Sequence, residues 1–430
     1  MIYPIKISES KDYFTLNGEK FFYLGDTMWT AFYNLTLDEW RYYLEFRKTQ
    51  NFNAVGINIL QQWDGGRSDL DMYPFQLDPK GGFDFYRLDE EYFQRACEML
   101  EMAVAAGFIP SLGVLHASYV PGTWATKNRP ESVMPEDAVK PYVEYVVKMF
   151  SPYNPIFSIG GDNDFKEEIT TRYYLKAFQA VKETNPEVLT TFCTNPNTIL
   201  PEEFASSDYL DFYTFQAGHR IEEQHFTYTL AKDFYDRPVK KPIVSGEFNY
   251  EGHGFGFENY GRYNDFHVRR AIWQGVLAGA KAGVRYGAHG LWGWYRRGKE
   301  FANERFAGSA FPWQVALQFK GAWDASYSKW LFETFDLFDI EPVDRIVNEN
   351  KQQRNEIRMS ASKNGDKVVI YIPYSVDVWV DMDLSGFELT LIDLVEKRIA
   401  RPAIDVKEGS TRIRMQHFNS DVLVIGRRKG

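Results

Sequence analysis

Two acidic residues follow apolar segments that have the composition of buried strands. Asp162 comes shortly after the run Pro155–Ile159, and Glu247 comes directly after the run Ile243–Gly246. Carboxylates are rarely buried without a partner, so an acid at the inner end of a strand needs a reason. In barrel enzymes the catalytic groups lie where the strands end, at the carboxyl face. The two segments therefore predict a catalytic carboxylate pair, Asp162 and Glu247.

Such a pair suits the hydrolysis of a glycosidic bond. This reaction needs one acid to protonate the leaving oxygen and a second carboxylate on the other side of the sugar. If Asp162 follows the fourth strand of a barrel and Glu247 the seventh, the two lie on opposite sides of one mouth. The chain is also rich in aromatic residues, with 34 Phe, 27 Tyr and 11 Trp. Most of these belong in a core, but those at strand ends could stack on sugar rings.

Apolar runs alternate with amphipathic helices over about the first 300 residues. A capping box, Thr36 with Glu39, marks the start of the first of these helices. Eight strands are predicted: Phe21–Gly25, Phe52–Leu60, Phe108–Leu115, Pro155–Ile159, Val188–Cys193, Tyr209–Phe215, Pro242–Ser245 and Gly283–Leu291. This rhythm predicts an α/β fold, a (β/α)8 TIM barrel. A doubly wound sheet is the alternative, but no Gly-rich phosphate loop follows any strand.

The two ends of the chain differ from the barrel pattern. Asn17-Gly18 between two apolar runs predicts an N-terminal β-hairpin. Beyond residue 344, short strands at regular spacing, with turns between them, predict a small C-terminal antiparallel β-sandwich. We therefore expect a barrel with its hairpin over residues 1–344 and the β-sandwich over 345–430. Trp379 is the only Trp of this tail, which has no strip of aromatic residues to bind glycan. We therefore expect the tail to support the barrel.

Three motifs lie at the carboxyl ends of predicted strands: Leu24–Trp29, Ile159–Asn163 and Gly246–Gly252. In these motifs the sequence resembles the apiosidase-like glycoside hydrolases, over the barrel and a small C-terminal β domain. The resemblance implies that Asp162 is the acid/base and Glu247 the nucleophile of a retaining mechanism. In many related barrel glycosidases the acid/base is a Glu preceded by Asn. Here Gly161 precedes an Asp, as in the apiosidase-like variant.

Other polar residues at strand ends are candidates for binding substrate. Asp164 could replace Asp162 as the acid, but it lies farther along the loop. Glu251 could bind a hydroxyl group or hold its loop, and Asp26 could bind hydroxyl groups or cap a turn. Neutral or weakly basic groups that would fix sugar hydroxyls follow other strands: Asn58, His116, Asn163, Gln216 and His219. Either histidine could equally have a purely structural role.

Four Trp residues are candidate stacking platforms, namely Trp29, Trp63, Trp292 and Trp294. Trp292 and Trp294 follow the eighth strand, and strand alternation would put both on one side. A metal enzyme is a competing interpretation, with His116, Asp162, His219 and Glu247 as ligands. Seven histidines are few for that role, and no His-x-His pair follows the first strand, so we expect no metal and no cofactor.

Composition excludes several classes of protein. A net charge of −10 and a pI near 5.4 argue against nucleic-acid binding, which needs a basic face. No run of apolar residues is long enough to span a membrane, and the first residues do not resemble a signal peptide. We therefore expect a cytoplasmic protein, and small imported glycosides as substrates rather than a polysaccharide. The two cysteines, Cys97 and Cys193, are expected to be buried thiols.

The sequence predicts a retaining, exo-acting glycoside hydrolase. Its substrate would be a plant-derived oligosaccharide or small glycoside; the resemblance implies that the terminal sugar is an apioside, and another pentoside or hexoside stays open. The alternative is a carbohydrate-binding barrel without catalysis. Two intact strand-end acids, Asp162 and Glu247, argue against this alternative, because a binding protein does not need both.

Overall fold

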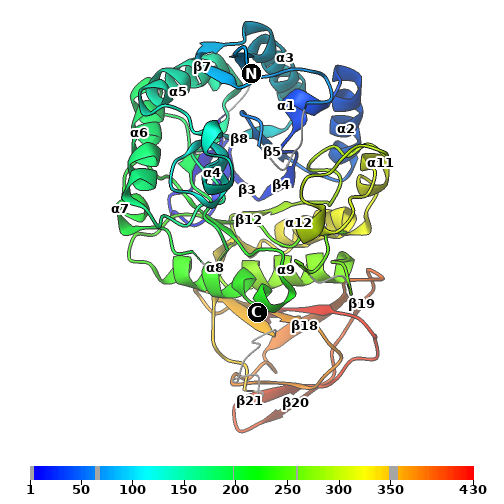
Figure 1. The fold of residues 1–430 in the computed structure, drawn as a ribbon. Helices are drawn as coiled ribbons and strands as arrows, with labels where there is room; N and C mark the ends of the chain where they lie inside the picture. Colours follow the sequence, from blue (N-terminus) through cyan, green and yellow to red (C-terminus); the bar gives the residue numbers. More distant parts are fainter. Residues whose placement is uncertain (1–3, 63–67, 197, 258–259, 348–356) are drawn as a thin grey trace.

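A computed structural model describes residues 4–62, 68–196, 198–257, 260–347 and 357–430. A ring of parallel strands lies inside a ring of helices (Figure 1). The strands are β4 (Tyr23–Thr27), β5 (Ala54–Asn58), β8 (Ile109–Gly113), β9 (Ile156–Ser158), β10 (Thr190–Thr191), β11 (Tyr213–Gln216), β12 (Ile243–Glu247) and β13 (Gly283–Tyr286). They pair in the order β10-β9-β8-β5-β4-β13-β12-β11, and a parallel bridge between Cys193 and Thr214 closes the ring. The predicted TIM barrel is confirmed.

The barrel strands are short and largely buried, and the helices that follow them bury one face against the sheet. The longer helices are α2 (Leu37–Thr49), α3 (Glu90–Ala105), α5 (Glu136–Phe150), α6 (Glu168–Thr184), α8 (Phe226–Asp236), α9 (Asp265–Leu277) and α12 (Lys320–Thr334). Shorter ones are α1 (Ala31–Asn34), α4 (Trp124–Asn128), α7 (Glu202–Ala205), α10 (Glu304–Ala307) and α11 (Trp313–Ala316). The capping box of Thr36 and Glu39 is present at the start of α2, as predicted.

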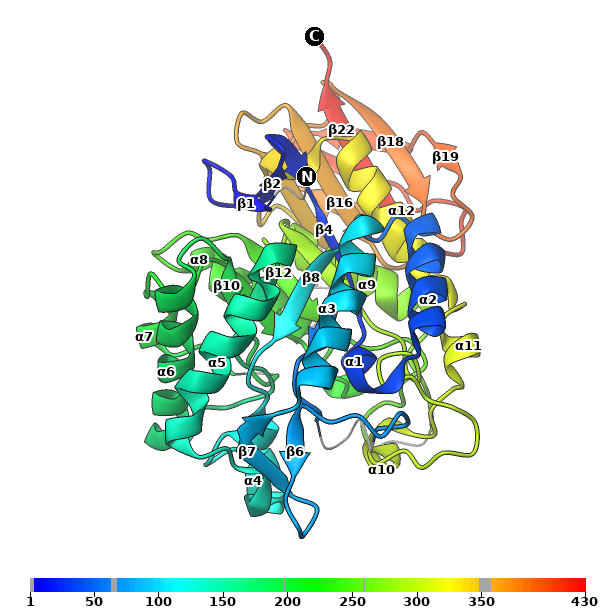
Figure 2. The ribbon, with the colours of Figure 1, turned by 90° about the horizontal axis from the view of Figure 1, so that it is seen from above.

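The two ends of the barrel are built differently. The strands β1 (Lys6–Ile7), β2 (Phe14–Leu16) and β3 (Glu19–Phe21) form a small sheet. Phe14 and Phe21 of this sheet pack with Tyr23 and Val244, which lie at the beginnings of barrel strands, so the sheet covers the amino end. The opposite end carries α4, α10 and the hairpin of β6 (Phe75–Leu77) and β7 (Phe83–Leu88) (Figure 2). Loops after the strands therefore form the open end.

The C-terminal residues form two antiparallel sheets. The six-stranded sheet contains β14 (Ile340–Pro342), β15 (Arg358–Ser362), β16 (Lys367–Ile372), β22 (Val422–Arg428), β18 (Phe387–Asp393) and β19 (Ile399–Ala400), in that order. The three-stranded sheet contains β17 (Val378–Val380), β21 (Ser410–Ile413) and β20 (Ile404–Lys407). The C-terminal antiparallel fold is therefore as predicted. The division at residues 344 and 345 stays a prediction, although β14 precedes it and pairs with β15.

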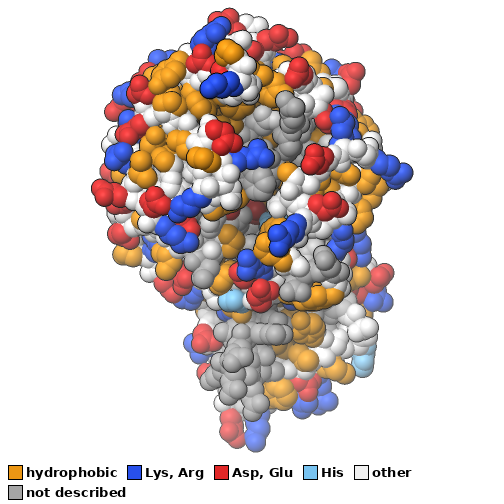
Figure 3. Space-filling view, in the orientation of Figure 1, with side chains coloured by type: hydrophobic (Ala, Val, Ile, Leu, Met, Phe, Trp, Pro, Cys, Tyr) orange, Lys and Arg blue, Asp and Glu red, His pale blue; other side chains and the backbone are white. Residues whose placement is uncertain are grey.

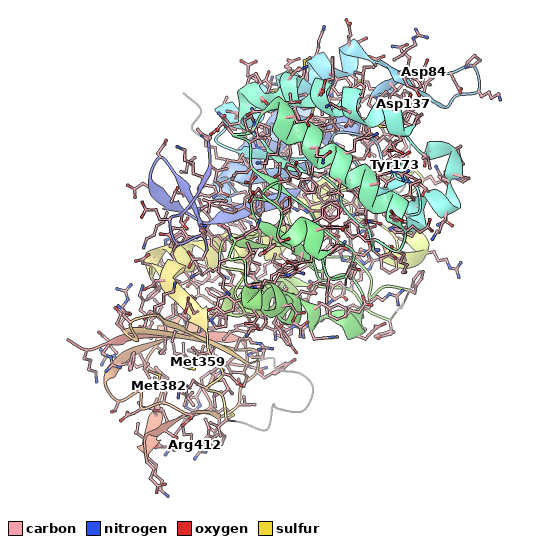
Figure 4. The ribbon with its side chains drawn as sticks, turned by 90° about the vertical axis from the view of Figure 1, so that its left-hand side faces the viewer. Asp84, Asp137, Tyr173, Met359, Met382 and Arg412 are labelled. Atoms are coloured by element: carbon pink, nitrogen blue, oxygen red, sulfur yellow. The ribbon has the colours of Figure 1, made fainter. Side chains whose placement is uncertain are left out.

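Alternation along the central strand β16 explains how this unit attaches to the barrel. Val369 and Tyr371 belong to the barrel core, whereas Val368 and Ile370 belong to a second core. This second core also includes Met359, with Met382 packed against it (Figure 4). Successive side chains of a strand point to opposite faces, so one sheet contributes to both cores. The sheet is thereby held against the barrel at α9.

Candidate active site

A cavity of about 850 Å³ opens at the carboxyl end of the barrel strands. We call it the main cavity; the space-filling view is hollowed near the centre of this face (Figure 3). Its wall includes eight of the residues predicted from the sequence: Trp29, Asn58, His116, Asp162, Gln216, His219, Glu247 and Trp292. Both predicted catalytic acids therefore border the same space.

Glu247 ends β12, and the barrel wall buries it almost completely, to 8% exposure. Its Oε1 accepts a hydrogen bond from Gln216 Nε2 at 2.6 Å and lies 3.1 Å from His219 Nε2. Its Oε2 accepts from the hydroxyl group of Tyr250 at 2.6 Å. The same hydroxyl accepts from Trp29 Nε1 at 3.0 Å. Both carboxylate oxygens are thus held in fixed positions.

These contacts keep Glu247 ionised although it is buried. Burial alone raises the pKa of a carboxyl group, because the charged form loses hydration. The hydrogen bond and electrostatic interaction with His219, the hydrogen bond from Tyr250 and the positive charge of Arg285 outweigh this effect and lower the pKa of Glu247. A carboxylate that stays charged in a largely buried position can act as a nucleophile.

Asp162 lies in the loop after β9, with its backbone in the left-handed region at φ 60°. Trp124 Nε1 donates a hydrogen bond to the Asp162 carbonyl at 2.8 Å, which fixes the loop. Gly160, two residues before Asp162, is required by space, because a Cβ there would lie 2.3 Å from the Tyr174 ring, whereas a Cβ on Gly161 would meet nothing within 4 Å. Asp164, the alternative acid, forms an ion pair with Lys166 at 2.6 Å and lies outside the lining of the main cavity.

His116 and Asn58 are held by their neighbours on the wall of the main cavity. His116 Nδ1 accepts from the Ser118 backbone N–H at 3.1 Å, and burial lowers the pKa of His116 to about 4. It is therefore a neutral group. Asn58 donates to the side chain of Gln62. Its Oδ1 lies where a Cβ on Gly113 would be, only 2.1 Å away, so a glycine is needed there.

Two of the predicted acids lie behind the wall of the main cavity. Asp26 is fully buried and forms an ion pair with Arg47 at 2.6 Å, and Tyr43 donates to it at 2.9 Å. Glu251 accepts from Tyr286 at 2.7 Å and from the backbone N–H of Gly321 at 2.9 Å. Burial raises the pKa of Glu251 to about 7.

Three further candidates are also not among the described lining residues of the main cavity. Asn163 is fully buried. Trp294 stacks on Trp313 with ring centroids 4.1 Å apart, and it borders a neighbouring cavity. Its φ of 50° places it in a turn, so the strand alternation expected for Trp292 and Trp294 does not extend to it. Trp63 lies outside the described residues.

Sequence reasoning missed two residues that contact this centre. Tyr250 lies three residues beyond Glu247, inside the motif Gly246–Gly252. Its position close to the end of the strand is the signal in the sequence that could have indicated a contact with Glu247. Arg285 lies on β13 with its guanidinium 4.4 Å from the centre of the Trp29 ring. Strand alternation puts Arg285 inside the barrel. A single arginine in an apolar run did not, however, indicate a contact with the residues around Glu247.

The described part of the chain lacks two kinds of feature. No helix there is long and apolar enough to cross a membrane. No group of three or more His, Cys, Asp and Glu side chains there is arranged to hold a metal ion. Both cysteines are free thiols; Cys193 is buried and Cys97 is partly buried.

Comparisons with known proteins agree with this architecture. A family model described as "Apiosidase-like, catalytic domain" matches residues 8–339. A solved structure described as a glycoside hydrolase is similar with a TM-score of 0.82 and 20% identity, over 99% of this chain and 97% of the other. A glycoside hydrolase family 5 protein from Bacteroides vulgatus is similar with a TM-score of 0.79 and 19% identity, over 99% and 93%. A search of curated proteins found no match. The family match spans most of the chain, which therefore belongs to the apiosidase-like family of glycoside hydrolases.

Proposed function

We propose that this protein is a retaining, exo-acting glycoside hydrolase with Glu247 as nucleophile and Asp162 as acid/base. The observation that carries the proposal is the environment of Glu247, which keeps a buried carboxylate charged at the wall of a cavity that Asp162 also borders. A general acid and a charged nucleophile on one cavity are the two groups that double displacement needs.

In this mechanism Asp162 begins protonated and donates its proton to the leaving oxygen as the glycosidic bond breaks. A Glu247 oxygen attacks the anomeric carbon and forms a covalent glycosyl-enzyme. Asp162, now a carboxylate, takes a proton from water, and this water releases the sugar with its original configuration. Retention requires the two carboxyl groups to be about 5–5.5 Å apart. Gln216, His219 and Tyr250 would orient Glu247 in both steps.

The substrate in this proposal is an apioside, or another pentoside or hexoside, at the end of a plant-derived oligosaccharide or small glycoside. Trp29 and Trp292 would supply stacking surfaces, and Asn58 and His116 would bind hydroxyl groups. A cavity with a few polar groups among aromatic ones is typical of ligand sites. Asp26, Asn163, Glu251 and Trp294 would act from behind the wall, by holding the residues in front of them.

A panel of aryl glycosides tests the reaction and the sugar together. Proton NMR of the first-formed product should show the same anomeric configuration as the substrate that is cleaved. An inverted first product would contradict the retaining mechanism. Measurable sugar affinity without hydrolysis of any glycoside would favour the alternative, a carbohydrate-binding barrel.

A further inference from the structure

A second cavity of about 590 Å³ adjoins the main cavity. We call it the hairpin chamber, because the β6–β7 hairpin forms one of its walls. The other walls come from α4 and its flanking residues and from the segment 293–302 after β13. Gln62 and Ala302 line both spaces, so the chamber continues the main cavity sideways.

Aromatic rings form a continuous wall of the hairpin chamber. The ring centroids of Tyr73 and Phe83 lie 6.2 Å apart, those of Phe83 and Phe85 6.1 Å apart, and those of Phe85 and Tyr119 6.1 Å apart. Tyr73, Phe83 and Phe85 are only half-buried, so parts of their rings remain available to a ligand. Flat apolar faces of this kind suit the C–H faces of a sugar ring.

The opposite face of the same hairpin is polar and points away from the chamber. Tyr86, at an outward position of β7, is 65% exposed and donates a hydrogen bond to Asp137 at 2.8 Å. Figure 4 shows Asp84 and Asp137 at this outer side of the hairpin. Alternation along β7 therefore directs Phe83 and Phe85 to the chamber and leaves Tyr86 outside, which provides a matched control position.

The charges of the hairpin chamber balance one another. Among the described residues its lining contains three acids and three bases: Asp69, Glu131, Glu300, Arg129, Arg296 and Lys299. Asp69 lies 2.5 Å from Arg296 and 3.3 Å from Lys299, and Arg296 also pairs with Glu39 at 2.7 Å. Arg296 and Lys299 are already paired and offer little to an anionic ligand, and the acids of the lining equal its bases in number, so the lining suits a neutral ligand.

We propose that the hairpin chamber binds a neutral sugar unit of the substrate, on the leaving-group side of the bond that is cleaved. This inference rests on the proposed function, because exo-acting cleavage leaves the main cavity to the terminal sugar and requires a separate place for the rest. The shared border at Gln62 lets one substrate molecule occupy both spaces. The aromatic wall stacks on the sugar, and the paired charges select against uronate chains.

Binding to a Glu247→Gln variant tests this proposal without requiring hydrolysis. The probes are xylotetraose, mannotetraose, cellotetraose, arabinotetraose and tetragalacturonic acid, together with the methyl glycosides of the same sugars. At least one neutral tetrasaccharide should bind, and adding Phe83→Leu should weaken it about 3- to 10-fold, because Leu keeps apolar bulk but lacks a flat ring. The matched Tyr86→Leu variant should bind the tetrasaccharide with unchanged affinity. The affinity for methyl glycosides should be the same with and without Phe83→Leu.

Three results would overturn the proposal: no neutral tetrasaccharide binds, tetragalacturonic acid binds best, or Phe83→Leu and Tyr86→Leu bind alike. If Phe83→Leu lowers the melting temperature, Tyr73→Leu replaces it, since Tyr73 lies on the same wall. Failure of the proposed reaction gives a different pattern. A wild-type protein that hydrolyses no glycoside, while its Glu247→Gln variant binds through Phe83, would contradict the reaction and leave this binding site standing.

Discussion

The hydroxyl group of Tyr250 donates a hydrogen bond to Glu247 Oε2 at 2.6 Å, and the two residues are only three positions apart in the sequence. Trp29, after the first barrel strand, donates to the same Tyr250 oxygen at 3.0 Å. The end of β12 is thereby connected across β13 to the end of β4. This connection fixes the rotamer of Glu247 from outside its own loop and helps to keep it charged.

Replacement of Tyr250 by Phe should raise the pKa of Glu247, because the hydrogen bond from Tyr250 lowers it. Glu247 must be ionised to react, so the acidic limb of the kcat/KM profile should move to higher pH. A hydrogen bond to a charged group contributes about 1.5–3 kcal/mol, so kcat/KM should fall about 10- to 100-fold at neutral pH. A lower kcat/KM with an unmoved acidic limb would mean that Tyr250 acts on the substrate instead.

The two acids of the β9 loop should behave differently when each is changed to Asn. Asp162→Asn should lower turnover by about 10²- to 10⁴-fold on glycosides with poor leaving groups, and much less on dinitrophenyl glycosides, which need no proton. Asp164→Asn is the matched control, since Asp164 pairs with Lys166 away from the cavity lining. Steady-state kinetics on both substrate types would reveal the reverse pattern if Asp164 were the acid.

Asp26 should matter mainly for stability. Its removal in Asp26→Ala leaves the charge of Arg47 buried and unpaired, which costs about 3–5 kcal/mol of unfolding free energy. Asp38→Ala removes an exposed ion pair with Arg41, and it should cost less than about 1 kcal/mol. Urea unfolding followed by circular dichroism measures both. Equal stability of the two variants, together with a large rise in KM for Asp26→Ala, would place Asp26 in contact with substrate.

Glu251 should make stability depend on pH. Burial raises its pKa from 4.5 to about 7, so the folded protein holds a proton that the unfolded chain releases. The free energy of unfolding should therefore decrease as pH rises through this window, by up to about 3 kcal/mol from this group. Glu251→Gln cannot ionise and should lose this decrease, whereas the exposed Glu98→Gln should retain it. Parallel stability curves for wild type and Glu251→Gln would contradict the shifted pKa.

The barrel could be predicted because its signals are local. Alternating apolar runs predict all eight barrel strands. Asn17-Gly18 predicts the hairpin of β2 and β3, in whose turn both residues have positive φ. Several strands are shorter than predicted, as for β10, which contains only Thr190–Thr191, whereas β4 and β12 end two residues later than predicted. The short strands β14, just before the tail, and β19–β21 within it were missed, because so few residues give little pattern.

Side-chain roles that depend on distant partners could not be predicted. Asp26 is predicted either to bind sugar hydroxyls or to cap a turn, and its ion-pair partner Arg47 comes from α2, 21 residues along the chain. Trp294 looked like a stacking platform, but it packs on Trp313 from a separate segment. Glu247 can be chosen as a candidate from the sequence, because a charged residue at the end of a buried strand is unusual in itself.

The central claim is that Glu247 forms the bond to the sugar, and chemical rescue of Glu247→Ala tests it most directly. On the aryl glycoside that the wild type cleaves best, turnover should fall by more than about 10³-fold. Added azide, which fits the space left by the carboxylate, should restore part of it and give a glycosyl azide of inverted configuration. Glu222→Ala, at an exposed position, should need no rescue. A Glu247→Ala variant with unimpaired turnover would contradict the account.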